Sequence, residues 1–311
     1  MITVVIPTVG RPSLRDTVAA VGSGVPVIVV DDRRAGAPLE LPAHVRVVRS
    51  GGRGPAAARN AGWRAAATPW VVFLDDDVVP RPGWAEAVWK DLVDLPDDVA
   101  GSQGRITVPL PEDRRPTDAE RHTAGLVDAA WVTADMAYRR AVLEAVGGFD
   151  ERFPRAYRED SDLALRVRRA GHRLVRGDRV TEHPVRADGF WASVRFQRGN
   201  ADDALMRRLH GPDWRAAIGS GRGRLRMHAV TTAAGLTAAL LTGAAVVRRR
   251  GWAAPALAGV VWGALTAEFA WRRVAPGPRT PDEVLRMALT SVVIPPVACA
   301  HRLRGEWKVR R

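Results

Sequence analysis

The sequence predicts an α/β fold with a mostly parallel sheet, helices on both faces, and an apolar helical segment at the C-terminal end. Three observations predict it. Short runs of β-branched residues recur over the first hundred positions, helix-like stretches lie between several of them, and long apolar stretches follow residue 220. Strand, helix and strand at this spacing are typical of a parallel sheet, in which ligands bind at the carboxyl ends of the strands.

The elements follow in order along the chain. The expected strands are Ile2–Ile6, Val25–Val30, Val45–Val48 and Val71–Leu74, and the first two expected helices are Leu14–Val21 and Pro55–Ala67. Residues 96–128 are rich in Pro, Asp and Arg and lack periodicity, so we expect an irregular connection with one strand near Gly104–Val108. Two further helices, each closed by glycine, are expected at Arg139–Val146 and from Glu159 to Ala170.

The composition of the chain becomes more apolar after residue 220. Ala229–Val247 contains no charged residue, Trp252–Trp271 contains one acidic residue before its end, and Val284–Ala300 is a weaker apolar stretch. A bilayer span needs about 20 apolar residues, although Ala and Gly make the first two stretches marginal. A membrane-associated tail and a soluble helical appendage both remain open, and so do spanning and flat orientations.

The net charge of +13 is concentrated in this tail. Residues 215–311 carry 16 Lys and Arg against 4 Asp and Glu, whereas residues 1–214 carry 31 against 30. Basic charge beside apolar segments indicates an anionic membrane surface more than nucleic acid, with a general arginine bias as the alternative. We therefore expect a catalytic domain at residues 1–214, a basic apolar tail at residues 215–311, and no nucleic-acid partner.

Cysteine content and the N-terminus bear on the compartment. A single cysteine, Cys299, excludes an intramolecular disulfide and a cysteine-based zinc site. The chain enters the run Ile2–Ile6 at once, without the basic start and apolar stretch of a secretory signal. Together with the basic tail, these features predict a catalytic domain at the cytoplasmic face of the membrane.

Three adjacent carboxylates, Asp75-Asp76-Asp77, follow the fourth expected strand. They repel one another, and a strand end beside the core is partly desolvated. A divalent cation such as Mg²⁺ or Mn²⁺ removes the conflict because it prefers hard oxygen ligands. Asp75 and Asp77 point to the same side of an extended chain, so one can face a ribose hydroxyl and the other a metal. Taken alone, the triplet is explained equally well by a solvated acidic turn.

Two further segments strengthen the functional interpretation. Asp31-Asp32 forms a second acidic strand end, which a parallel sheet can bring near the first. Residues 51–60 form a glycine-rich turn entering a helix. Backbone N–H groups of such a turn, with Arg53 or Arg59, suit a phosphate group.

Together these segments resemble family 2 glycosyltransferases of the GT-A fold, a Rossmann-like α/β architecture. The resemblance covers about residues 1–210, and its strength lies in the order and spacing of motifs that are individually unspecific. The matching segments are Val4-Val5-Ile6-Pro7-Thr8, Val30-Asp31-Asp32, residues 54–60, Phe73-Leu74-Asp75-Asp76-Asp77, residues 136–140, residues 147–151 and Glu159-Asp160-Ser161-Asp162-Leu163.

The resemblance implies a donor site at the first strand ends. Asp75 and Asp77 match the family's DXD motif, Asp75 for the ribose and Asp77 for the metal, with Asp76 also at the donor. Asp31 would contact the nucleotide base, and Arg59 would lie near the base or the phosphates. The base pocket would be lined by Pro7, Thr8 and Arg11.

Two later residues receive roles from the same resemblance. His183 occupies the position of a further metal ligand, with an ordinary loop histidine as the alternative. Asp160 would be the catalytic base, at a helix start where the helix dipole stabilises a carboxylate. The alternative is that Glu159 or Asp160 only caps that helix.

The implied enzyme is a hexosyltransferase type of glycosyltransferase. It would move one sugar from a nucleotide-diphosphate sugar to a hydroxyl acceptor, with inversion and a divalent cation. Such an enzyme would act in the synthesis of a cell-envelope polysaccharide, a glycolipid or another glycoconjugate. Its acceptor could then be lipid-linked. A nucleotidyltransferase is one alternative, although residues 9–12 poorly match its glycine-rich loop. The other alternative is a catalytically degenerate, membrane-bound interaction module, and the intact carboxylates argue against this alternative.

Overall fold

The computed structural model describes residues 1–186 and 189–310 and divides into two compact units. The first, here called the sheet unit, comprises residues 1–109, 123–185 and 216–220. The second, here called the helical unit, comprises residues 110–122, 186–215 and the chain from residue 221 onward. Each unit is described by itself.

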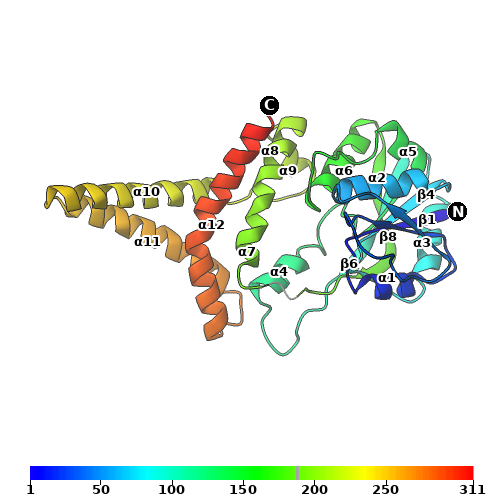
Figure 1. Ribbon diagram of the computed structural model, residues 1–311, viewed down its shortest axis with the longest axis horizontal. Coiled ribbons are helices and arrows are strands. Elements are labelled where there is room, and N and C mark those ends of the chain that lie inside the picture. The colour runs from blue at the N-terminus through cyan, green and yellow to red at the C-terminus, as the bar shows by residue number, and fades with distance from the viewer. Residues whose placement is uncertain (187–188, 311) are drawn as a thin grey trace. The chain divides into compact units, whose positions relative to one another are not determined.

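The sheet unit contains one eight-stranded sheet in the order β3-β2-β1-β4-β7-β6-β8-β5 (Figure 1). Its four N-terminal long strands, β1 to β4, pair in parallel, and β6 pairs in parallel with β8. β7 is antiparallel to both of its neighbours, and β5 is antiparallel to β8. The strands are β1 (Ile2–Thr8), β2 (Val27–Asp31), β3 (Val45–Arg49), β4 (Trp70–Leu74), β5 (Val79–Pro80), β6 (Val99–Thr107), β7 (Asp135–Arg139) and β8 (Arg173–Glu182).

Helices cover both faces of the sheet, as the sequence predicts. Alternate residues of a strand point to opposite faces, so the buried strands β1 and β4 feed two separate cores. One core contains Val4 and Val72 and takes side chains from α1 (Leu14–Val21) and α3 (Trp84–Val93). The other contains Val5 and Phe73, and the helices that contribute side chains to it are α2 (Pro55–Ala65), α5 (Arg140–Ala145) and α6 (Glu159–Arg169).

The expected fold class is confirmed, with one region better ordered than predicted. Residues 96–128 hold the nine-residue strand β6, which overlaps the one strand expected near Gly104–Val108, and the helix α4 (Asp118–Ala124), where we expected an irregular connection. The sequence of β6 does not show the hydrophobic pattern of a buried strand, because its buried residues include Gly101, Ser102 and Gln103. These small or polar residues fit between β7 and β8, where the Gln103 amide donates a hydrogen bond to the Ala129 carbonyl at 3.0 Å.

The helical unit contains the three longest helices of the described chain, α10 (Leu225–Arg248), α11 (Ala253–Val274) and α12 (Pro281–Lys308). By length and composition each can cross a membrane. Shorter elements complete the unit: α4, α7 (Ala192–Arg195), the 3₁₀ turn η1 (Phe196–Arg198) and α8 (Gly199–His210). A four-residue helix, α9 (Trp214–Ala217), lies at the division between the units.

Candidate active site

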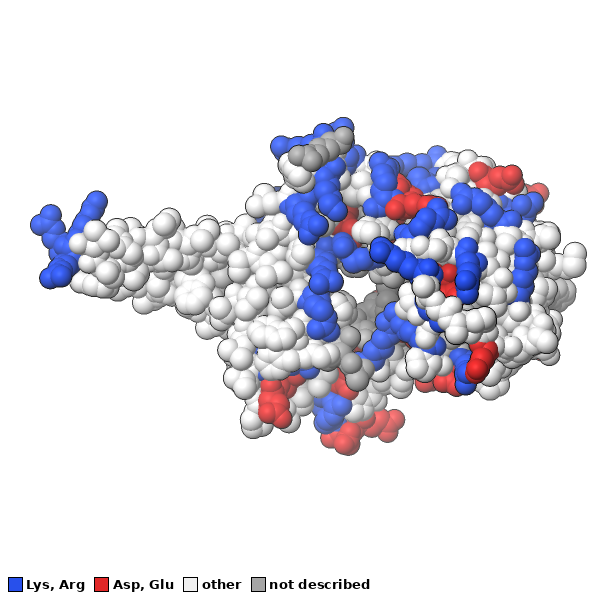
Figure 2. Space-filling model, in the orientation of Figure 1, with Lys and Arg blue, Asp and Glu red and all other residues white. Residues whose placement is uncertain are grey.

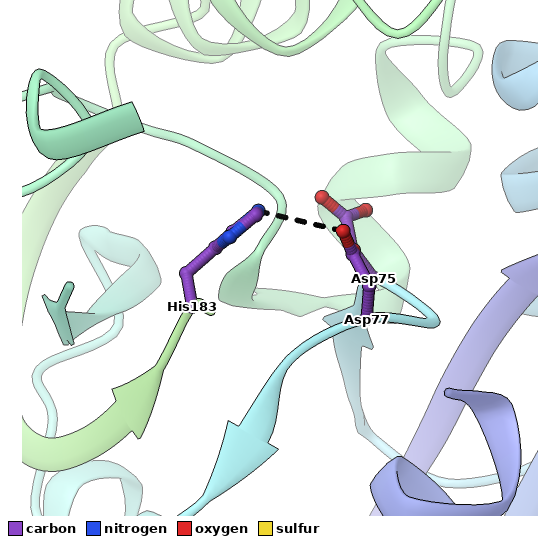
Figure 3. Close-up of side chains that lie close together, drawn as sticks. All are labelled: Asp75, Asp77 and His183. Atoms are coloured by element: carbon purple, nitrogen blue, oxygen red, sulfur yellow. Dashed lines mark ion pairs between the residues drawn. The ribbon is translucent and has the colours of Figure 1, made fainter. Parts of the chain in front are cut away.

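The acidic triplet and His183 meet at the edge of the sheet. Asp75 and Asp77 lie in the turn after β4, and β5 follows within two residues. β5 pairs with the end of β8, where Val79 lies opposite Glu182. This short ladder places His183 beside Asp77, with 3.9 Å between His183 Nε2 and Asp77 Oδ2 (Figure 3). Asp75, Asp77 and His183 each offer a ligand atom within 4.8 Å of the others.

The donor set fits a divalent cation. The backbone N–H of His183 is fixed by a 2.8 Å hydrogen bond to the Thr107 carbonyl. His183 Nδ1 lies 3.1 Å from the Pro184 carbonyl, so Nδ1 carries the proton and donates it. The lone pair of Nε2 then points toward Asp77, as in histidine metal ligands oriented by a second hydrogen bond. Two carboxylates and one imidazole suit Mn²⁺ well and Mg²⁺ less well.

Arg59 lies between carboxylates that outnumber it. Its buried guanidinium donates to Asp75 Oδ1 at 2.8 Å and to Glu159 Oε1 at 2.7 Å. The charge of Asp160 also acts on it. Two cations, Arg59 and Arg158, therefore act on three carboxyl groups, and Asp77 adds a fourth nearby. Such a surplus of negative charge favours binding of a cation.

Asp160 and Glu159 stand at the start of α6. Burial raises the pKa of Asp160, and the backbone N–H of Ser161 opposes that rise with a 2.6 Å hydrogen bond. Burial also raises the pKa of Glu159, against the attraction of Arg59. Glu159 is fixed in its ion pair, whereas Asp160 remains half-buried. A carboxylate with a raised pKa and access to solvent is a stronger base than an ordinary aspartate.

The predicted base-pocket residues form a connected group at the end of β1. Thr8 Oγ1 donates to Asp76 at 2.6 Å, and Arg11 donates to the other oxygen of Asp76 at 2.5 Å. Pro7 lies in β1 directly before Thr8. Asp76 thus ties the DXD turn to the first strand, and the structure brings Pro7, Thr8, Arg11 and Asp76 together.

Asp31 and Asp32 act differently although they are adjacent. Arg33 donates to both oxygens of Asp31, at 2.8 and 2.9 Å, and thereby lowers the pKa of Asp31. Asp32 instead accepts the backbone N–H groups of Arg53 and Gly54. We expected the glycine-rich turn to offer these N–H groups to a phosphate. Asp32 takes two of them, because it lies inside the turn and is buried.

One buried network escaped the sequence analysis. Arg179 of β8 donates to Asp135 at 2.7 Å and to Asp91 at 2.9 Å, and none of its side chain is exposed. Asp135 also accepts hydrogen bonds from Trp84 and Thr181. The network fixes the part of β8 that leads to His183. The charged residues spread along Arg173–Glu182 gave no sign of a strand, and only Arg179 and Thr181 of β8 are buried.

Comparison with known proteins assigns the chain to a family. Residues 3–156 match the model of glycosyl transferase family 2, and this stretch contains β1 to β4, the DXD turn and the glycine-rich turn. The fold is a mostly parallel α/β sheet flanked by helices, the GT-A architecture. The chain belongs to glycosyltransferase family 2.

Two known proteins are among those similar to the chain. A pre-mycofactocin glycosyltransferase of Mycobacterium tuberculosis is 33% identical over 79% of this chain, and the chain spans 57% of that relative's length. The mannosyltransferase PcManGT from Pyrobaculum calidifontis, solved in complex with GDP-Man and Mn²⁺, shares the fold. Its TM-score is 0.51 at 17% identity, covering 99% of this chain and 87% of that one.

Proposed function

We propose that the chain transfers a single sugar from a nucleotide-diphosphate sugar to a hydroxyl acceptor, with inversion at the anomeric carbon. The observation that carries the proposal is the cluster of Asp75, Asp77 and His183 beside the Arg59 ion pairs. This arrangement offers metal ligands in a region of surplus negative charge. A nucleotide diphosphate bridged by a cation complements it in charge.

Asp77 and His183 would hold a Mn²⁺ or Mg²⁺ ion, with Asp75 directed at the donor ribose. The ion would supply electrostatic stabilisation to the departing diphosphate. Asp31, which lies opposite Thr8 in the pairing of β1 with β2, would form the nucleotide pocket together with Pro7, Thr8, Arg11 and Asp76. Arg59 would hold Asp75 in position through their ion pair at 2.8 Å, in addition to lying near the phosphates.

Asp160 would act as the general base. The acceptor hydroxyl oxygen attacks the anomeric carbon, and its proton passes to the Asp160 carboxylate. The bond between that carbon and the diphosphate oxygen breaks, and the nucleoside diphosphate leaves with the electron pair. Burial makes Asp160 more basic than an ordinary aspartate, which favours the proton transfer.

The sugar and the acceptor are proposed at the level of class. We propose a hexosyl donor and a role in making a cell-envelope polysaccharide, glycolipid or other glycoconjugate. The name of the mycobacterial relative makes pre-mycofactocin the first acceptor to test, and lipid-linked hydroxyl acceptors come next because of the apolar helices. We further propose residues 1–214 as the catalytic domain and residues 215–311 as a membrane-associated tail, with the catalytic domain on the cytoplasmic face.

A donor screen tests this function. The full chain in detergent is heated with each of a panel of nucleotide sugars, with Mn²⁺ and with EDTA, and the melting temperature is measured. We expect one or a few donors to raise the melting temperature only when Mn²⁺ is present. Stabilisation that is indifferent to EDTA would refute the metal site. If incubation with a donor and an acceptor released a sugar 1-phosphate in place of a nucleoside diphosphate, the reaction would be nucleotidyl transfer.

A further inference from the structure

The helices α10 and α11 form a hairpin whose surface is apolar and open. They lie side by side in Figure 1 and are joined by a short turn in which Arg249 and Gly251 have positive φ. Only 11% of the most apolar window of α10 and 17% of that of α11 is buried. Leu236, Leu240 and Leu257 are each more than half exposed. An exposed apolar surface this extensive is expected to be covered by lipid or by another molecule.

The two helices pack closely on each other. A Cβ added at Gly235 of α10 would lie 2.9 Å from the indole ring of Trp262 in α11. The absence of a side chain at Gly235 therefore makes room for the Trp262 indole ring between the two helices. Close contact through small residues is typical of helix pairs in lipid, where packing rather than the hydrophobic effect drives association. The exposed Leu residues are therefore left for an outside partner.

The length of the hairpin matches a bilayer. At 1.5 Å per residue, the 24 residues of α10 span about 36 Å and the 22 residues of α11 about 33 Å. The hydrocarbon core of a bilayer is about 30 Å thick. Trp252 and Trp271 begin and nearly end α11, are more than half exposed, and lie about 29 Å apart along the axis. Exposed tryptophans at this separation are typical of the two membrane interfaces.

Charge gathers at the two ends of the hairpin. Arg248, Arg249 and Arg250 form the tip, and Figure 2 shows the visible surface behind them white, without charged side chains. At the base, Glu268 is neutralised by ion pairs with Arg224, at 2.7 Å, and with Arg272. A helix lying flat in an interface needs a charged face toward water. Residues 229–247 contain no charged residue, so α10 has no such face.

α12 has comparable hydropathy but a different environment. A third of its most apolar window is buried, and its buried residues extend from Glu283 to Gly305. A Cβ at Gly305 would lie 2.5 Å from the Ala201 carbonyl of α8, so the two backbones touch. α8 carries four charged residues along its length, two acidic and two basic. A spanning α12 would draw these charges into hydrocarbon, which is costly.

We propose that the α10–α11 hairpin crosses the bilayer twice while α12 stays outside it. The tip, Arg248–Arg250, then lies beyond the far leaflet, and α12 lies on the side of the hairpin base. The base carries more basic residues than the tip, six against three over residues 222–226, 248–250 and 272–279. This excess favours the cytoplasmic side for the base. The inference rests on the proposed membrane association and adds a topology to it.

Cysteine accessibility tests this topology in the full chain. In a Cys299→Ser background, single cysteines are introduced as Arg250→Cys at the tip, Arg222→Cys at the base and Arg310→Cys after α12. Membrane vesicles of one known orientation, prepared from the expressing cells, are treated with a membrane-impermeant maleimide before and after detergent. We expect positions 222 and 310 to react from one side, and position 250 to react at least tenfold less until detergent opens the vesicles.

Each of the other outcomes would overturn a specific part of the proposed topology. If the chain pellets with vesicles but all three positions react alike from one side, the hairpin does not cross. If positions 250 and 310 react together and opposite to 222, α12 crosses as a third span. If the chain stays in solution as a dimer protected along α10 and α11, a second copy is the occupant. Loss of vesicle binding altogether would refute the membrane association itself, and the donor screen would still stand.

Discussion

Arg59 in the sheet unit and Arg273 in the helical unit are both nearly inaccessible to solvent, yet their surroundings differ in charge. Arg273 meets one carboxylate among the described residues, Asp118 at 2.8 Å, and hydroxyl groups of Ser193, Thr290 and Ser291. Arg59 faces Asp75, Glu159 and Asp160. Asp118 also pairs with Arg121 at 3.4 Å, so the group around Arg273 has no surplus carboxylate, whereas a surplus of carboxylates around Arg59 favours binding of a cation. The comparison distinguishes a structural ion pair from a binding site.

Removing a carboxylate should therefore have opposite effects in the two units. Asp160→Asn removes a surplus negative charge and the proposed base. We expect the transfer rate to fall at least about 100-fold, the usual contribution of a general base, while the melting temperature stays the same or rises. Product formation and thermal unfolding are measured on the same preparation. Asp178→Asn, at an exposed ion pair with Arg105, is the control, and turnover within tenfold of wild type in Asp160→Asn would exclude it as the base.

Asp118→Asn makes the corresponding change at Arg273. Because it leaves a buried guanidinium without its carboxylate, we expect the free energy of unfolding to fall by about 3 kcal/mol. The transfer rate per folded molecule should not change. Urea denaturation in detergent measures the stability. An unchanged urea midpoint would mean that the three hydroxyl groups suffice for Arg273, and the two arginines would then differ less than proposed.

Binding of Mn²⁺ tests whether the carboxylates near Arg59 belong to a metal site. His183→Ala removes the nitrogen ligand and should weaken Mn²⁺ binding about tenfold or more, with a smaller effect on Mg²⁺. The loss of the free Mn²⁺ signal in electron paramagnetic resonance measures the affinity. His44→Ala, at an exposed histidine, serves as the matched control. Equal affinities in the two variants would remove His183 from the ligand set.

The acid side of the pH profile should show the smallest effect. Burial raises the pKa of Asp160 above its ordinary value of 3.8, and the base must be deprotonated. As pH falls through the raised pKa, Asp160 takes up a proton and the turnover number should fall with it. The fall should therefore begin at a higher pH than for an exposed aspartate. A turnover number that stays constant down to about pH 4 would contradict the burial of a catalytic carboxylate.

Much of the sheet could be predicted from sequence because its strands are locally marked. β1, β2 and β4 are buried β-branched runs, and α1 begins and ends where the sequence indicated. β8 was not predicted, since its burial depends on carboxylates elsewhere in the chain that pair with Arg179. Local patterns report hydrophobic burial well and report buried ion pairs poorly.

The residues of the candidate site also differ in how well the sequence predicts them. The motif residues around Asp77 and Asp160 were recognisable from their order in the chain. The placing of His183 with Asp77 as a metal ligand rested on the family resemblance alone. Local patterns could not give it, because it depends on the pairing of β5 with β8 across about a hundred residues. The ion pair between Arg59 and Glu159 was missed for the same reason, since those residues lie on α2 and α6.

Anomalous diffraction from crystals grown with Mn²⁺ and a donor nucleotide tests the central claim most directly. We expect one strong Mn²⁺ peak at the end of β4, within coordination distance of Asp77 and His183 and close to the donor diphosphate. Asp160 should face the anomeric carbon across from the diphosphate. A donor bound with no Mn²⁺ peak beside Asp77, or a peak elsewhere in the sheet unit, would contradict the proposed site.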